Sequence, residues 1–196
     1  HSGNYYPFFM HIPGFRVAIP TTPRDAKGLM KTALRCNDPV LFLEHKDVLM
    51  LKGPVPEEEY LIPFGQAAVA REGKDVTVVA IAAMVPKSLQ AGEALAKEGV
   101  SVEVIDPRTL APLDIDTIVA SVHKTGRLLI VDEDFAPCGV GAEIAAQVMA
   151  RAFDDLDAPV QRLNGAFAPA ATSAAFDNMV PNVPDIVQAV RDLLAE

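Results

Sequence analysis

The stretch HSGNYYPFFMHIPGFRVAIPTTPRDAKGLMKTALRCNDPVLFLEHK, residues 1–46, decides the fold. It predicts a strand over Phe15–Pro20, a helix over Pro23–Arg35 and a second strand over Pro39–Glu44. This order is typical of the second half of an α/β domain whose first half is missing. Two strands and one helix cannot cover both faces of a mainly parallel sheet. We therefore expect both strands to expose apolar surface in this chain taken alone.

The helix over Pro23–Arg35 has clear start signals. Thr22 stands at the N-cap position, Pro23 at the first helical position, and Asp25 in the first turn, where a carboxylate suits the helix dipole. Apolar residues then recur at the spacing that forms one stripe along a helix. We expect this stripe to be core against the sheet; it consists of Ala26, Leu29, Met30, Ala33 and Leu34.

Residues 53–66 differ in composition from their surroundings and predict a linker between two domains, because they combine three prolines, an acidic run and flanking glycines. After the linker, strands and helices alternate. The predicted strands cover 76–82, 100–106, 127–133 and 159–165, and the predicted helices cover 85–98, 114–126, 140–153 and 183–196. Such a series predicts a mostly parallel sheet with helices on both faces.

The composition excludes several classes of partner. The 196 residues carry 17 Lys and Arg against 26 Asp and Glu, a formal charge of −9, which argues against nucleic acid and anionic membrane surfaces as partners. No stretch reaches the ~18 apolar residues of a membrane span, and no signal peptide is visible. Cys36 and Cys138 show no pairing pattern, which favours a reducing compartment.

Two loops, 106–114 and 132–144, follow predicted strands, and ligands of open α/β sheets bind at such positions. The second loop contains Gly139-x-Gly141, but the third small residue of a dinucleotide fingerprint would fall at Ile144. We interpret these glycines as a turn into a helix.

The sequence shows no His or Cys spacing typical of a zinc site and no complete set of catalytic residues. His1 and His11 could move protons near neutral pH, or they could be ordinary loop histidines.

Motifs along the whole chain resemble, in the same order, the beta chain of thiamine-diphosphate-dependent 2-oxo acid dehydrogenases. This family is the decarboxylating component of pyruvate or branched-chain 2-oxoisovalerate dehydrogenase complexes and is transketolase-like. The motifs that carry the resemblance are FFMHIPG, IPTTPRDAKGLMKTALR, NDPVLFLEHK, VPEEEYLIPFG, EGKDVTVVA, EVIDPRTLAPLD, KTGRLLIVDE, GVGAEIA, LDAPVQRLNG and VPNVPDIVQAVR.

The resemblance implies an α/β fold in three parts. Residues 1–52 correspond to the C-terminal part of a pyrimidine-binding domain with a mostly parallel sheet, 53–66 to the linker, and 67–196 to a three-layer αβα domain of the transketolase C-terminal type. The glutamate that activates the cofactor belongs to the missing front half of the first domain. Thiamine diphosphate and Mg²⁺ are held mainly by the alpha chain or alpha region. We therefore expect the isolated fragment to be inactive.

The resemblance also implies a few site residues. His1 matches the active-site histidine of the family's His-Ser-Gln motif, with Gly3 in place of the glutamine, and is expected to handle substrate and protons. Relatives hold a structural K⁺ mainly through carbonyl oxygens at the end of the first long helix. The corresponding positions are Ala33, Leu34, Cys36 and Asp38, although Cys36 is a poor ligand for a hard cation.

The expected function is oxidative decarboxylation of a 2-oxo acid on thiamine diphosphate, with transfer of the acyl group to a lipoyl domain. The expected partners are an alpha subunit or region, a second beta chain and an acyltransferase core carrying the lipoyl domain, in a heterotetramer-based complex. It would work in the bacterial cytoplasm or, in a eukaryote, in the mitochondrial matrix. Two alternatives stay open: a non-catalytic module for dimerisation and docking to the core, and a transketolase-type enzyme.

Overall fold

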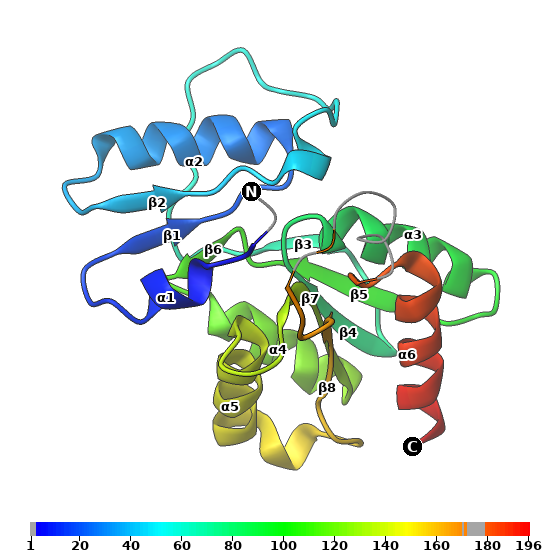
Figure 1. Cartoon of the computed structure of the whole chain (residues 1–196). Coiled ribbons are helices and arrows are strands. Elements are labelled where there is room, and N and C mark those ends of the chain that lie inside the picture. The colour runs from blue at the N-terminus through cyan, green and yellow to red at the C-terminus, as the bar shows by residue number, and fades with distance from the viewer. Residues whose placement is uncertain (1–2, 170, 172–178) are drawn as a thin grey trace.

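The computed structural model describes residues 3–169, 171 and 179–196. Its larger part is a five-stranded sheet in the order β3-β5-β4-β7-β8 (Figure 1). The strands are β3 (Ala68–Arg71), β4 (Val76–Ala80), β5 (Val102–Asp106), β7 (Leu128–Phe135) and β8 (Gln161–Gly165). All neighbours run parallel except β3, which lies antiparallel at one edge. The predicted mostly parallel sheet is confirmed.

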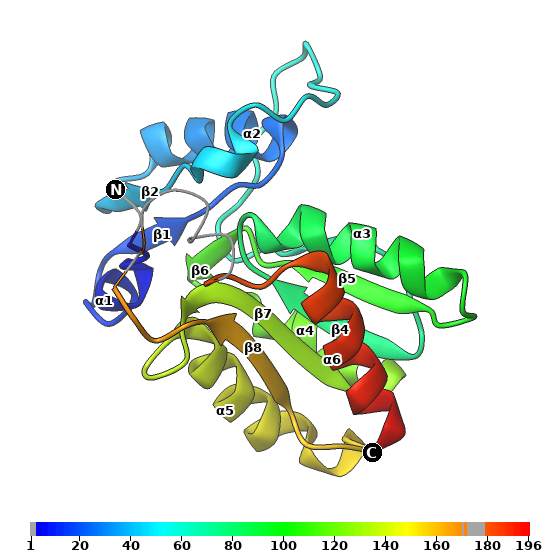
Figure 2. The ribbon, with the colours of Figure 1, turned by 45° about the vertical axis from the view of Figure 1, so that its right-hand side comes forward.

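Helices cover both faces of this sheet (Figure 2). One core cluster joins the sheet to α3 (Met84–Ala96) and α6 (Val183–Ala195), and a second joins its other face to α4 (Ile115–Thr125) and α5 (Val140–Ala152). The short 3₁₀ helix η2 (Phe153–Asp155) follows α5. The three-layer αβα arrangement expected from the resemblance is therefore present. Among the described residues, no helix is long and apolar enough to cross a membrane.

The amino-terminal segment forms a second, smaller sheet. It contains α1 (Tyr6–Met10), β1 (Arg16–Ala18), α2 (Pro23–Arg35), β2 (Val40–Phe42) and the 3₁₀ helix η1 (Lys46–Val48). β1 pairs in parallel with β2 and, on its other side, antiparallel with β6 (Thr109–Ala111), which lies in the loop after β5. A strand from the second part of the chain thus completes the sheet of the first part.

This third strand corrects one expectation. The side chains of Val17 and Ala18 are fully buried and that of Ile19 is 3 % exposed, so the strand expected over Phe15–Pro20 does not present apolar surface. The pairing with β6 and the packing of α1 against β1 account for this burial. In β2 all three residues are half-buried.

The stripe on α2 is core only in part. Leu29 is fully buried, whereas Met30 is 36 % and Leu34 79 % exposed. The prediction that the whole stripe is core is therefore wrong. The β2-β1-β6 sheet beside α2 consists of three strands of three residues each, so it does not cover the whole stripe.

Local signals place the helix ends as predicted. Thr22 Oγ1 accepts a hydrogen bond from the Asp25 N–H at 3.1 Å, and Asp114 Oδ1 caps α4 by accepting from the Thr117 N–H at 3.1 Å. Gly126 ends α4 in the left-handed conformation, at φ 67°. Residues 51–66 contain no helix or strand, in keeping with the predicted linker.

Candidate functional site

Two cavities lie at the carboxyl end of β7, and the amino-terminal segment contributes to both. The larger has a volume of about 890 Å³ and the smaller about 310 Å³. Asn4 and Tyr5 line both cavities, so the segment is a shared wall. Loops after parallel strands form ligand sites in open α/β sheets, and both cavities occupy such a position.

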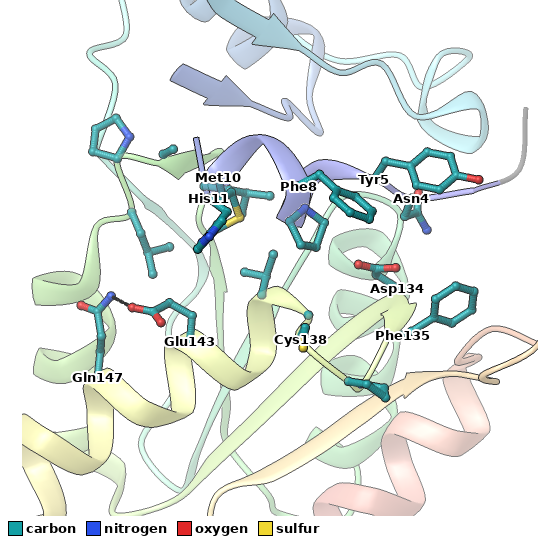
Figure 3. Close-up of a pocket in the computed structure, with 18 residues that line it drawn as sticks. Asn4, Tyr5, Phe8, Met10, His11, Asp134, Phe135, Cys138, Glu143 and Gln147 are labelled. Carbon is teal, nitrogen blue, oxygen red and sulfur yellow. Dashed lines mark hydrogen bonds between the residues drawn. The ribbon is translucent and has the colours of Figure 1, made fainter. Parts of the chain in front are cut away.

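The larger cavity has an apolar middle and polar ends (Figure 3). Phe8, Met10 and Val140 contribute to its apolar lining. His11, Glu143 and Gln147 lie toward one end, where Gln147 Nε2 donates to Glu143 Oε1 at 2.7 Å, and Asn4, Asp134 and Phe135 lie toward the other. Cys138 also lines this cavity; its thiol is free and the residue is exposed.

The smaller cavity contains a histidine paired with a buried glutamate. His45 Nε2 contacts Glu133 Oε1, and the Asp47 N–H donates to His45 Nδ1 at 3.2 Å. Because Nδ1 accepts, the ring proton of the neutral imidazole is on Nε2 and is donated to Glu133. Burial lowers the pKa of His45, but the hydrogen bond and the charge of Glu133 outweigh burial, so the pKa is raised.

Three consecutive carboxylates, Asp132, Glu133 and Asp134, lie near the end of β7, directly before its last residue Phe135. Burial raises the pKa of Asp132 to about 7, against the lowering effect of a hydrogen bond from Tyr6. The Tyr6 hydroxyl donates to Asp132 Oδ1, as does the Asp134 N–H at 3.1 Å, whereas Asp132 Oδ2 has no partner among the described residues. Burial also raises the pKa of Asp134, and burial followed by the charge of Asp132 raises that of Tyr6.

The loop 106–114, which the sequence singles out, ties the two parts of the chain together. Arg108 has a left-handed backbone, at φ 58°, and its guanidinium donates to Asp25 at the start of α2 and to the carbonyl oxygens of Gln66 and Ala67. Asp106, which is 2 % exposed, accepts the Arg108 N–H at 2.9 Å. This loop acts as a structural junction.

The predicted site residues fall in different places. His1 lies outside the described residues. His11 is exposed and lines the larger cavity. At the end of α2, the Cys36 N–H donates to the carbonyl oxygen of Ala33 at 3.2 Å, and Arg16 forms an ion pair with Asp38 at 2.8 Å. Arg16 thus already neutralises Asp38, and the K⁺ ligand set stays a prediction.

The sequence analysis did not identify Tyr6 and His45 as site residues. It also did not predict that Asp132 and Glu133 are buried and bind these two side chains. The available signal was a run of acidic residues directly after an apolar strand, because carboxylates at such a position are solvated or have a specific partner.

In the turn before α5, Gly139 permits a close approach of the backbone, since a Cβ there would lie 2.3 Å from the carbonyl oxygen of Phe135. The left-handed residue of this turn is its neighbour Cys138, at φ 57°.

No group of three or more His, Cys, Asp or Glu within residues 3–169, 171 and 179–196 could hold a metal ion. Tyr6, His45 and the β7 carboxylates instead bind one another. The residues that line the two described cavities therefore supply apolar surface, hydrogen-bonding groups and titratable side chains, but no set of metal ligands of this kind.

Comparisons with known proteins agree with this architecture. Residues 1–52 match the family described as "Transketolase, pyrimidine binding domain", and residues 65–186 match "Transketolase, C-terminal domain". The chain is 45% identical over 192 residues to the acetoin:2,6-dichlorophenolindophenol oxidoreductase subunit beta of Cupriavidus necator, covering 97% of this chain and 57% of that protein. It is 46% identical over 183 residues to the pyruvate dehydrogenase E1 component subunit beta of Bacillus subtilis, covering 93% and 56%.

Among solved structures, the chain is similar to a split-gene transketolase described as an inactive beta4 tetramer, with a TM-score of 0.81 and 25% identity, over 96% of this chain and 60% of that one. The chain spans little more than half the length of the curated relatives named above. The two matched domains, in this order, confirm the resemblance drawn from the sequence motifs. The chain therefore belongs to the transketolase family, and its relatives include the beta subunits of pyruvate and acetoin dehydrogenase E1 components.

Proposed function

We propose that this chain is part of the beta component of a thiamine-diphosphate-dependent dehydrogenase that decarboxylates a 2-oxo acid and transfers the acyl group to a lipoyl domain. The observation that carries the proposal is identity of 43–46% to acetoin and pyruvate dehydrogenase beta subunits over 93–100% of the chain. Pyruvate and branched-chain 2-oxo acids are candidate substrates. Acetoin joins them because it appears in the names of two of these relatives.

Thiamine diphosphate, when bound, supplies the carbanion chemistry, and the protein orients it. As the resemblance implies, we assign the diphosphate and Mg²⁺ to an alpha subunit or alpha region. This chain's own contribution is to shape the site. In the proposal His1 handles substrate and transfers a proton, and the segment that follows it, residues 3–11, forms the wall of two cavities.

The proposed partners are an alpha subunit, a second beta chain and an acyltransferase core. The similar split-gene transketolase is described as an inactive beta4 tetramer. That description supports the view that this chain requires an alpha partner for activity. We further propose domain boundaries near residues 52 and 66, and a location in the bacterial cytoplasm or the mitochondrial matrix.

A non-catalytic assembly role is the second candidate. Two observations favour it. Arg108 and β6, both in the loop after β5, bind the amino-terminal segment, so this loop has a structural role. The apolar side chains of Met30 and Leu34 on α2 are exposed. A transketolase-type enzyme is a third candidate, supported by the solved structure at 25% identity.

The test uses the full polypeptide that contains this chain, produced together with its alpha partner. Reduction of 2,6-dichlorophenolindophenol is measured with pyruvate, a branched-chain 2-oxo acid or acetoin, with and without thiamine diphosphate. We expect reduction that depends on the cofactor and on one of these substrates. An assembled complex that binds the acyltransferase core but reduces no dye would instead support the assembly role. Transfer of a two-carbon unit between sugar phosphates would support the transketolase alternative.

A further inference from the structure

Three side chains from the amino-terminal part of the chain meet the acidic end of β7. The Tyr6 hydroxyl donates to Asp132 Oδ1, and Asn4 Nδ2 donates to Glu133 Oε1 at 3.4 Å. His45 Nε2 contacts the same oxygen of Glu133. Tyr6 is 3 % exposed and Asp132 is fully buried. The hydrogen bonds of Tyr6 and Asn4 attach the segment 3–11 to β7, and His45 contacts the same acidic run from the residue before η1.

We infer that Tyr6 and Asp132 are positioning residues, whose hydrogen bond fixes the segment 3–11 as the wall shared by the two cavities. The inference rests on the proposed function for its catalytic consequence, because this segment closely follows His1 in the sequence. Asp134 and Asn4, which line the larger cavity, lie within two residues of Asp132 and Tyr6 respectively. A displaced Tyr6 would therefore move the polar end of that cavity (Figure 3).

The position of the segment depends on Tyr6 more than on its neighbours. α1 has five residues, too few to be stable as an isolated helix, so it requires tertiary contacts. Tyr6 packs in the same core cluster as Val17 and Ile19. Tyr5 and Phe8 are 62 % and 71 % exposed and so contribute much less burial. Phe9 and Met10 also pack against this cluster, and the Phe9 ring contacts that of Phe15, but both are only partly buried. Tyr6 is the buried residue of α1 and adds a directed hydrogen bond to Asp132.

The groups around this contact make it sensitive to pH. Asp132 faces Tyr6 from α1 and its own neighbours Glu133 and Asp134 on β7. His45 binds Glu133, with Asp47 and Lys87 of α3 close enough to influence it. When Asp132 loses its proton, a buried charge results beside two carboxylates, with Oδ2 lacking a donor. Opening of the segment would let water reach that oxygen.

The direction of the effect follows from linkage. When the segment 3–11 is packed against β7 (the closed form), burial raises the pKa of Asp132 from 3.8 to about 7. When the segment detaches (the open form), the pKa of Asp132 returns toward its ordinary value. The closed form therefore binds more protons between about pH 4 and 7. As the pH rises through that window, the population ratio of detached to packed segment increases by up to about tenfold per pH unit, and it levels off above pH 7.

Amide hydrogen exchange of the full protein tests the inference directly. We compare the wild type with Tyr6→Phe, Asp132→Asn and, as a matched control, Tyr60→Phe, whose hydroxyl donates to the carbonyl oxygen of Arg24 at 2.8 Å. After correction for the intrinsic pH dependence of exchange, we expect Tyr6→Phe to increase exchange in residues 3–12 by about tenfold or more. Asp132→Asn should abolish the extra pH dependence, and Tyr60→Phe should change neither.

An unchanged exchange rate and pH dependence in both Tyr6→Phe and Asp132→Asn would overturn the inference. The isosteric Asp132→Asn keeps the test open if Tyr6→Phe folds poorly. In the complex with the alpha partner, we expect Tyr6→Phe to lower kcat with little change in KM, unlike Tyr60→Phe. Equal kcat values for the two variants would refute a role in positioning the site. A wild-type complex without dye reduction would refute the proposed function, and the exchange result would still decide how the segment is held.

Discussion

The guanidinium of Arg108 donates to a carboxylate oxygen of Asp25 at 2.9 Å, and the two side chains are only 11 % and 10 % exposed. Arg108 belongs to the loop after β5 and Asp25 to the first turn of α2, so the ion pair joins this loop to the amino-terminal segment. Breaking a buried pair by removing one partner leaves an uncompensated charge.

Arg108→Ala is therefore expected to lower the free energy of unfolding by about 3–5 kcal/mol. The matched control is Arg151→Ala, because Arg151 pairs with an Asp116 side chain that is 90 % exposed. Its effect should stay within about 0.5 kcal/mol. Urea unfolding followed by circular dichroism measures both, since the chain contains no tryptophan for fluorescence. Equal effects of the two variants would show that the buried pair does not join the parts.

Asp106 is expected to make stability depend on pH. Burial raises its pKa to about 7 from 3.8, so the folded state binds a proton that the unfolded state has lost between those values. Its stabilising contribution is complete below about pH 4 and is lost as the pH rises to about 7, a change on the order of a few kcal/mol. Asp114, whose pKa is lowered despite burial by hydrogen bonds from Ala67 and Thr117, acts in the opposite direction, but below pH 4.

Asp106→Asn keeps an acceptor for the Arg108 N–H and removes the titrating charge. Unfolding free energies measured from pH 4.5 to 8 should therefore fall less steeply in this variant than in the wild type. Asp116→Asn, at an exposed position, should retain the wild-type slope. If Asp106→Asn also retains it, Asp106 is not the group that titrates.

Two leucines on α2 provide a matched comparison of burial. Leu29 is fully buried and Leu34 is 79 % exposed. We expect Leu29→Ala to lower the unfolding free energy by about 2–5 kcal/mol and Leu34→Ala to change it by less than about 0.5 kcal/mol. Both are measured by urea unfolding of the same protein preparation. A large loss at Leu34 would mean that this side chain is covered in solution, for example by a second chain.

Two helical glycines are expected to respond oppositely to alanine. A Cβ at Gly28 of α2 would lie 2.6 Å from Ile62 Cγ1 in the linker, whereas a Cβ at Gly92 of α3 would meet the flexible side chain of Arg71 at 3.1 Å. Alanine favours a helix by up to about 1 kcal/mol over glycine. Gly92→Ala should thus be neutral or stabilising in thermal unfolding, and Gly28→Ala should destabilise by about 1–3 kcal/mol through overpacking. Stabilisation by Gly28→Ala would show that the linker shifts away easily.

Much of the fold could be predicted because local signals and periodicity agreed. α2 runs over Pro23–Arg35 as expected from Thr22 and Pro23, and α4 lies between Asp114 and Gly126. Short elements could not be predicted in this way. β6 has three residues next to Pro112, and α1 has five, so both exist through contacts with residues distant in sequence. For the same reason the burial of the α2 stripe depended on the width of a sheet that periodicity does not reveal.

The candidate site was less predictable than the fold. Residues of the segment 132–144 line both cavities, although the first four residues of this predicted loop belong to β7, and His11 lines the larger cavity. The partner of Asp132 could not be inferred, because Tyr6 lies 126 positions away and carries no motif. A buried pair of this kind depends on how the two parts of the chain pack, and a strand pattern does not encode that packing.

The pairing of β1 with β6 also constrains how the protein is made. Val17 has Ala111 as its partner, so the first sheet stays incomplete until the ribosome has synthesised the loop after β5. Such distant pairings slow folding, because a long loop must close before the contact forms. During synthesis the apolar side chains of β1 would remain uncovered while most of β3, β4 and β5 emerges, and this interval is when a chaperone would be of most use to the nascent chain.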